Sequence, residues 1–244
     1  MTKLVRIFSA RACAQPIEKA ARLFEERTGI RVQIDACSRH CAKPAAEVAT
    51  GETGGGDFLI EISNAGIHDL AIGGAEYLLD DGEVRGIVKK GCRRTIASRV
   101  SAIIVRAGNQ KNIRKIEDLA RPDVRDATSM IDCLKGLWED VTSRLGLLDA
   151  IRPNIAYRAN GCIAIVEAVA DAAFGWTAFK HLAPDKIYVI EMPESQQILR
   201  GAGVGLLRFS RQPELARQFM NFLASPDSRK FYEDYGWVNP NRRS

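Results

Sequence analysis

Residues 4–34 read LVRIFSARACAQPIEKAARLFEERTGIRVQI, a stretch in which the spacing of apolar residues changes twice. Residues 4–8 form a short apolar run, typical of a strand. Apolar residues within 17–24 recur with the i, i+3, i+4, i+7 spacing of an amphipathic helix. Gly29 follows as a helix stop, and apolar residues then alternate with polar ones over residues 30–34, as in a second strand.

The same alternation of strands and helices continues along the chain. Further strands are predicted at residues 58–62, 100–106, 127–131, 154–157, 173–176, 187–190 and 198–209. Further helices are predicted at residues 42–50, 134–141, 163–170, 213–224 and 227–235. This order predicts an α/β fold of two Rossmann-like lobes with mixed, mostly parallel sheets. Lobe one is expected to hold residues 1–96 and 196–244, and lobe two residues 97–195.

Composition narrows the class of protein. The chain has 244 residues, of which 27% are charged, so it has enough apolar material for a core and is not a disordered type. No apolar run reaches the roughly 18–20 residues that span a bilayer. The net charge of +5 is dispersed, so no nucleic-acid partner is expected. The first residues lack the apolar region of a signal peptide, which predicts a cytoplasmic protein, or a periplasmic one if a leader has been removed.

Sequence motifs of catalysis are missing. The glycine-rich residues 51–57 lack the Gly-Lys-Ser/Thr ending of a phosphate loop, and the glycines of residues 201–205 fall inside a predicted strand. The three histidines are scattered, and no catalytic triad can be assembled from the motifs. We therefore expect a protein that is not an enzyme.

Cysteines are concentrated where predicted strands pass into predicted helices. Five of the six lie at such junctions: Cys13, Cys37, Cys41, Cys133 and Cys162. A further predicted junction, residues 63–67, carries none. Ligands of open parallel sheets bind outside the carboxyl ends of the strands, where these junctions lie. Helix N-termini also lower the pKa of thiols, and the thiolate is the form that binds metals.

If both lobes face one cleft, Cys13 and Cys41 enter it from lobe one, and Cys133 and Cys162 from lobe two. Four convergent thiolates suit an iron–sulfur cluster, zinc or another thiophilic metal. Cys37 is the alternative to Cys41 as a ligand. Other interpretations stay open, since a single cysteine is usually a small buried hydrophobe, and Cys37 and Cys41 could form a disulfide or share one helix face.

Three cationic side chains flank these cysteines, namely Arg11, Arg39 and Lys135. Their charge would offset that of an anionic cluster or bind an oxyanion directly.

Three segments of the chain resemble a known family. They are residues 20–32 (AARLFEERTGIRV), residues 47–63 with their EVATG and DFLIEIS runs, and residues 216–236 (ARQFMNFLASPDSRKFYEDYG). They are similar to the type II periplasmic solute-binding proteins, in particular to the molybdate- and tungstate-binding branch. The resemblance covers nearly the whole chain and implies two lobes that close on a small ligand in a cleft, without chemistry.

In that branch, hydroxyl and backbone N–H groups at these junctions hold the oxyanion. The resemblance places the expected serines at Ala12 and Cys41, the amide positions near Lys135 and near Gly161–Cys162, and the wall tyrosine at Trp176. Because two hydroxyls are missing and thiols stand in or beside the site, the comparison favours a thiophilic ligand over molybdate.

Together these observations predict a carrier or transport component, a monomer, that holds a metal or iron–sulfur-type cluster through cysteine thiolates. Its partner would be a cluster-receiving protein or an ABC permease. The alternative is a protein that binds molybdate, tungstate or sulfate for an ABC importer.

Overall fold

Residues 4–36 fold as a strand, a helix and a second strand parallel to the first, as predicted. β1 (Leu4–Ser9) and β2 (Arg31–Ala36) pair in parallel, and α1 (Arg11–Thr28) connects them. The helix ends at Gly29, whose φ of 69° is left-handed and suits a residue without a Cβ atom. The change in hydrophobic spacing was therefore enough to locate this unit.

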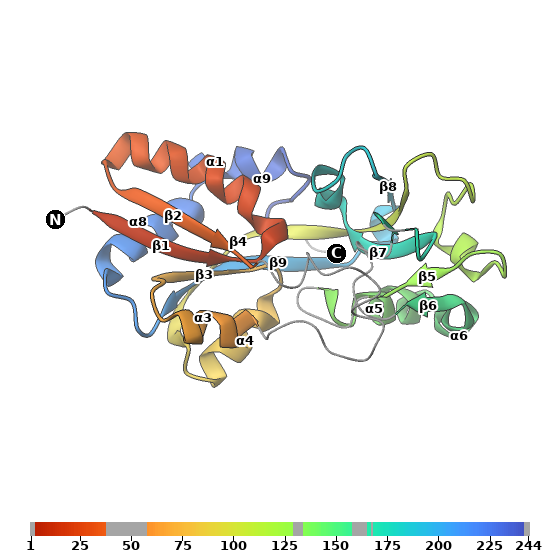
Figure 1. Ribbon diagram of the computed structural model, residues 1–244, viewed down its shortest axis with the longest axis horizontal. Coiled ribbons are helices and arrows are strands. Elements are labelled where there is room, and N and C mark those ends of the chain that lie inside the picture. Colours follow the sequence, from red (N-terminus) through yellow and green to blue (C-terminus); the bar gives the residue numbers. More distant parts are fainter. Residues whose placement is uncertain (1–2, 38–57, 129–133, 158–164, 167, 242–244) are drawn as a thin grey trace. The chain divides into compact units, whose positions relative to one another are not determined.

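The computed structural model describes residues 3–37, 58–128, 134–157, 165–166 and 168–241 (Figure 1). The chain divides into two compact units. Of the described residues, the first contains 3–37, 58–99 and 200–241, and the second contains those within 100–199. The predicted helix at 42–50 and the glycine-rich stretch at 51–57 lie outside the described residues.

The first unit is a mixed sheet with helices on both faces. Its strands follow the order β2-β1-β3-β9, and β9 adjoins β4. β1 pairs in parallel with β3, whereas β3 and β9 are antiparallel. Figure 1 shows α1 and α9 on one side of these strands and α3 and α4 on the other. The remaining elements are β3 (Leu70–Gly73), β4 (Val88–Arg106), β9 (Leu199–Leu207), α3 (Phe58–Ala65), α4 (Glu76–Val84), α8 (Pro213–Leu223) and α9 (Pro226–Glu233).

The strand predicted at residues 58–62 is wrong, because these residues begin α3. Phe58, Leu59 and Ile62 are buried, whereas Ile60 is 46% exposed, which is the one-sided burial of a helix. A short apolar run fits both periods, so its spacing could not distinguish them. The true third strand is β3, and the junction that follows it is Gly74–Ala75 instead of residues 63–67.

In its described residues, the second unit contains residues 100–106 of β4 and four further strands. β7 (Ala172–Trp176) and β8 (Ile187–Glu191) pair antiparallel with β4, while β5 (Asp126–Ala127) is parallel to β7 and β6 (Ile155–Tyr157). Its described helices include α5 (Leu137–Arg144) and α6 (Leu148–Ile151), with short 3₁₀ turns at Ile116–Ala120, Arg152–Asn154, Thr177–His181 and Glu194–Gln196. The parallel and antiparallel pairs together confirm the predicted mixed α/β fold.

The closing helices, also confirmed, pack onto the first unit. Phe219 and Phe222 of α8 place their ring centroids 4.9 and 5.3 Å from that of Phe24 on α1. Tyr232 of α9 stacks on Trp237 and donates a hydrogen bond to the carbonyl of Leu223, 2.8 Å away. These contacts join the end of the chain to its beginning.

Candidate functional site

The carboxyl ends of β1, β2 and β3 meet at one edge of the first unit. Ser9 and Ala36 are partners in the parallel register of β1 and β2. The N–H of Cys37 donates to the carbonyl of Ser9 (2.9 Å), and the N–H of Ala10 donates to the carbonyl of Ile72 (3.0 Å). Backbone hydrogen bonds therefore hold together the residues at which the three strands end, where ligands of α/β sheets bind.

Helix α1 begins at this edge. Ala10, its N-cap, makes no side-chain capping bond, and no acidic residue occupies the first turn. The N–H of Arg11 donates to Sγ of Cys37 (3.3 Å), and Nε of Arg11 donates to the carbonyl of Cys37 (3.2 Å). The positive end of an 18-residue helix and one guanidinium group therefore lie together here, and both favour an anion.

A fully buried arginine belongs to the same edge. Arg99 lies on β4 with 0% exposure, and its Nη1 donates to the carbonyl of Gly74 (2.9 Å), which follows β3. The sequence analysis did not single it out. A lone arginine between Ser98 and Val100, in a stretch that is otherwise apolar, was the available signal, because charged residues are seldom fully buried.

One carboxylate lies close to this edge and is already paired. Asp35, on β2, accepts a hydrogen bond across 2.9 Å from the ring of His68, which is 3% exposed. The ring of His68 also packs edge-on against Phe8. The N-terminus of α1, Arg11 and Arg99 therefore provide more positive charge at this edge than Asp35 provides negative charge. This arrangement suits an oxyanion better than a metal cation.

The described part of the chain contains six of the predicted site residues. Arg11 is exposed and Ala12 half-buried at the start of α1, Cys13 is fully buried on that helix, and Cys37 is 5% exposed. In the second unit, Lys135 is exposed in the turn before α5, and Trp176 is fully buried at the end of β7. Of these six, Arg11 and Cys37 are joined by hydrogen bonds. Arg39, Cys41, Cys133, Gly161 and Cys162 lie outside the described residues.

The metal prediction finds no support here. Within the described part of the chain, Cys13, Cys37 and Cys92 form no disulfide, and Nη1 of Arg217 lies 3.6 Å from Sγ of Cys92. Over the residues for which side chains are placed, no group of three or more His, Cys, Asp or Glu could hold a metal ion. Three of the five proposed cysteine ligands are not among those residues.

The second unit contains a buried acid that sequence reasoning missed. Asp126 on β5 is 4% exposed, and burial, followed by repulsion from Asp171, raises its pKa to about 8. Burial alone would also raise the pKa of Asp171, but hydrogen bonds from the guanidinium and N–H of Arg125 lower it below its ordinary value. Two neighbouring acids are therefore held in opposite protonation states near neutral pH.

Comparison with known proteins identifies the class. The sequence profile of the family described as "Bacterial extracellular solute-binding protein" matches residues 5–238. The chain belongs to this family. Within the described ranges, no helix is both long and apolar enough to cross a membrane.

Individual relatives are distant. The molybdate-binding protein ModA of Mycobacterium tuberculosis is 21% identical over 209 residues, which cover 81% of this chain and 76% of that protein. Peb3 from Campylobacter jejuni is 17% identical, with a TM-score of 0.73 over 96% of this chain and 99% of that one. The periplasmic molybdate-binding protein of Azotobacter vinelandii is 20% identical, with a TM-score of 0.70 over 97% and 100%. The likeness to these structures establishes the fold.

Proposed function

We propose that the protein binds a tetrahedral oxyanion, such as molybdate, tungstate or sulfate, and delivers it to the permease of an ABC importer. The observation that carries this proposal is the N-terminus of α1. It lies at the carboxyl edge of the sheet, without an acidic residue in its first turn, beside Arg11. The molybdate-binding relatives support the same class of ligand.

Family membership also bears on where and how the protein acts. We place it outside the cytoplasmic membrane, since its family is one of extracellular proteins, and the cytoplasmic prediction gains no support. Capture and release of a solute need no bond to be made or broken, so the protein is proposed as a binder that performs no catalysis.

A metal or iron–sulfur cluster is less well supported as the ligand than a tetrahedral oxyanion. Cys13 is fully buried on α1, and the thiol of Cys37 accepts the N–H of Arg11. Both thiols therefore take part in packing the first unit, which is the ordinary role of a buried cysteine.

Thermal unfolding of the full chain tests the proposal. A ligand that binds the folded state raises Tm by mass action, so Tm should rise with the concentration of molybdate, tungstate or sulfate, but not with chloride at equal ionic strength. Arg11→Gln should weaken this response, whereas Arg22→Gln, an exposed arginine farther along the same helix, should leave it unchanged.

Two outcomes of these measurements would contradict the oxyanion proposal. No shift with any of the three oxyanions, together with iron and acid-labile sulfide in protein purified without oxygen, would overturn the proposal in favour of a cluster. Equal loss in both arginine variants would show that the response depends on overall charge and not on this site.

A further inference from the structure

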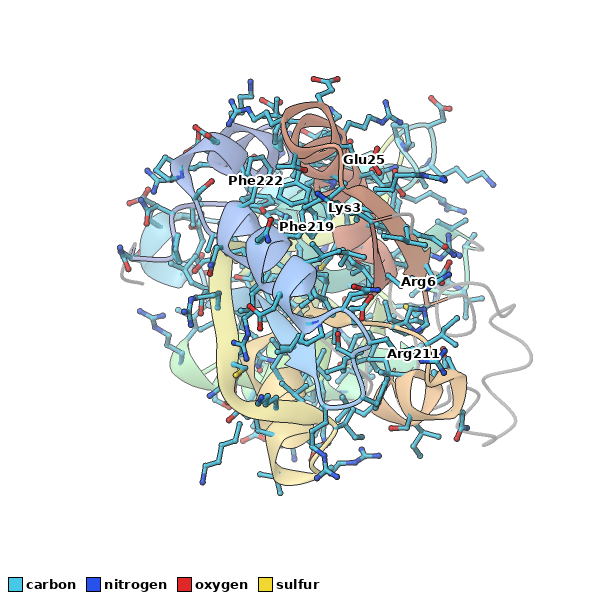
Figure 2. All side chains as sticks on the ribbon, turned by 90° about the vertical axis from the view of Figure 1, so that its left-hand side faces the viewer. Lys3, Arg6, Glu25, Arg211, Phe219 and Phe222 are labelled. Carbon is cyan, nitrogen blue, oxygen red and sulfur yellow. The ribbon has the colours of Figure 1, made fainter. Side chains whose placement is uncertain are left out.

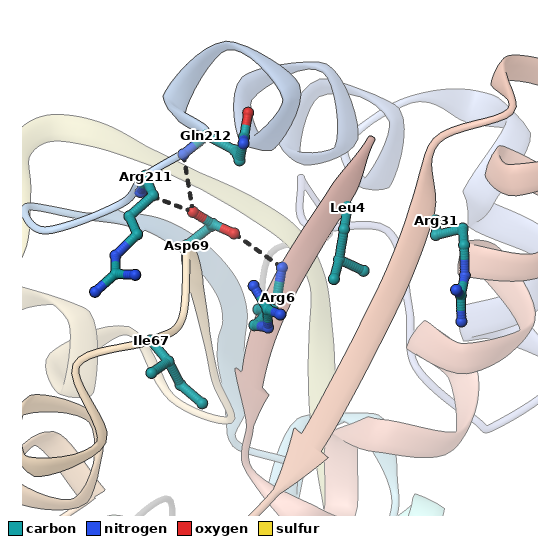
Figure 3. A pocket seen from close by; sticks show the side chains of 7 residues that line it. All are labelled: Leu4, Arg6, Arg31, Ile67, Asp69, Arg211 and Gln212. Atoms are coloured by element: carbon teal, nitrogen blue, oxygen red, sulfur yellow. Dashed lines mark hydrogen bonds between the residues drawn. The ribbon is translucent and has the colours of Figure 1, made fainter. Parts of the chain in front are cut away.

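A second cationic pocket lies at the opposite edge of the first unit, where β1 and β2 begin. It encloses about 400 Å³ and is lined by Leu4, Arg6, Arg31, Ile67, Asp69, Arg211 and Gln212 (Figure 3). Figure 2 looks onto this side of the unit, with Arg6 and Arg211 labelled. Because β1 and β2 run in parallel, the beginnings of these strands and their carboxyl ends lie at opposite edges, so this pocket is separate from the oxyanion site.

Strand register places two of its arginines on one face of the sheet. Arg31 is the register partner of Leu4, and Arg6 lies two residues further along β1. Side chains of paired residues, and of residues two apart, point to the same face. Arg6 and Arg31 therefore approach the pocket from adjacent strands.

The buried carboxylate of Asp69 holds the third arginine, Arg211, close to Arg6. Asp69 is 2% exposed; its Oδ2 accepts the N–H of Arg6 (2.9 Å), and its Oδ1 accepts the N–H groups of Arg211 (3.1 Å) and Gln212 (3.2 Å). The hydroxyl of Ser210 donates to the same Oδ1 across 2.6 Å. Figure 3 shows Arg211 and Arg6 on either side of this carboxylate, with Arg31 on the next strand.

The carboxylate of Asp69 is thus occupied by backbone and hydroxyl donors, and the guanidinium groups are not bonded to it. Among the side chains that the structure describes, Arg6, Arg31 and Arg211 form no ion pair. Three guanidinium groups and one carboxylate therefore line the hollow, and the excess of positive charge attracts an anion.

We propose that this pocket binds the phosphate group of an organic molecule. Guanidinium groups pair with phosphate oxygens through two parallel hydrogen bonds, and three of them line the site. The volume falls within the range of organic ligand sites, about 300–1,000 Å³. Leu4 and Ile67 provide apolar walls for the carbon portion of the ligand. Such a group occurs on soluble phosphate esters and on phospholipid headgroups, and the pocket matches the chemistry that both share.

Calorimetric titration of the full chain with sn-glycerol 3-phosphate tests the soluble source. Flotation with phosphatidylcholine vesicles, with and without phosphatidylglycerol, tests the lipid source. We expect binding in at least one arm, weakened about tenfold or more by Arg6→Gln and by Arg211→Gln, because each removes a charged hydrogen-bond donor. Their backbone N–H groups, and so the bonds to Asp69, are kept. Arg22→Gln is the matched control and should bind normally.

If the Arg6→Gln variant does not fold, the Arg31→Gln variant takes its place in the experiment, because Arg31 is exposed. No binding in either arm, unchanged binding in the pocket variants, or an equal loss in Arg22→Gln would overturn the proposal. Failure here is distinguishable from failure of the oxyanion proposal, because the Arg6 and Arg211 variants should keep the molybdate-induced rise in Tm, and Arg11→Gln should keep the binding of glycerol phosphate.

Discussion

The N–H of Arg11, the first residue of α1, donates a hydrogen bond to Sγ of Cys37, the residue after β2, across 3.3 Å. The two residues are 26 positions apart, and the bond fixes the start of the helix against the end of the neighbouring strand. The thiol thereby satisfies one of the N–H groups that a helix leaves without an internal partner.

Replacing Cys37 with alanine should lower the free energy of unfolding by about 1–2 kcal/mol, since it removes this acceptor and leaves a small cavity. Urea denaturation measures the loss. Cys92→Ala, at a half-buried position on β4, removes the longer contact of Sγ with Nη1 of Arg217 (3.6 Å) and should cost less, about 0.5 kcal/mol. Equal losses would show that the bond to Arg11 adds nothing to stability.

An acidic residue at Ala12 should separate folding from ligand binding. A carboxylate in the first turn of α1 interacts favourably with the helix dipole, so Ala12→Asp should fold normally. The same charge repels an oxyanion at the helix N-terminus, and we expect affinity for molybdate to fall at least about tenfold. Isothermal titration measures the affinity, with Ala12→Asn as the uncharged control. Unchanged binding in the aspartate variant would place the oxyanion elsewhere.

Asp126 should make stability depend on pH. Its pKa of about 8 in the folded protein exceeds the ordinary value of 3.8, so the folded state keeps a proton that the unfolded chain releases. The contribution to stability is complete below about pH 4 and is lost as the pH rises through about 8, at on the order of 1.4 kcal/mol for each pH unit.

Asp126→Asn removes this dependence. The free energy of unfolding of the variant, minus that of the original chain, should be larger at pH 8.5 than at pH 5. Urea unfolding at both pH values measures this difference. Asp149→Asn, at an exposed position in the same unit, should show no such gain. Parallel stabilities of the Asp126 variant and the original chain at both pH values would contradict the raised pKa.

Tyr232 should anchor the closing helices. Tyr232→Phe keeps the stacking on Trp237 but leaves the carbonyl of Leu223 without its hydroxyl donor, at a cost of about 1–2 kcal/mol. Tyr188→Phe, at a residue that is 56% exposed, should change the free energy of unfolding by less than about 0.5 kcal/mol. Chemical denaturation compares the two, and equal effects would show that the hydroxyl of Tyr232 is not needed.

Much of the secondary structure could be predicted because it depends on neighbours within a few residues. The period of residues 17–24 located α1, Gly29 marked its end, and the last two helices lie close to the predicted residues 213–224 and 227–235. Residues 58–62 were mistaken for a strand because five apolar-rich residues fit either period. β3 was missed because its four residues are all buried and do not alternate.

The sequence by itself determined the α/β class, the solute-binding resemblance and the importance of the junction at Arg11. Only the tertiary structure decided which distant residues meet: Arg11 with Cys37, Arg99 with Gly74, and Arg6 with Arg211 through Asp69. Local periodicity records which face of an element is buried. Strand register and the packing of remote segments decide which side chains share a site, because those contacts form between residues far apart in the chain.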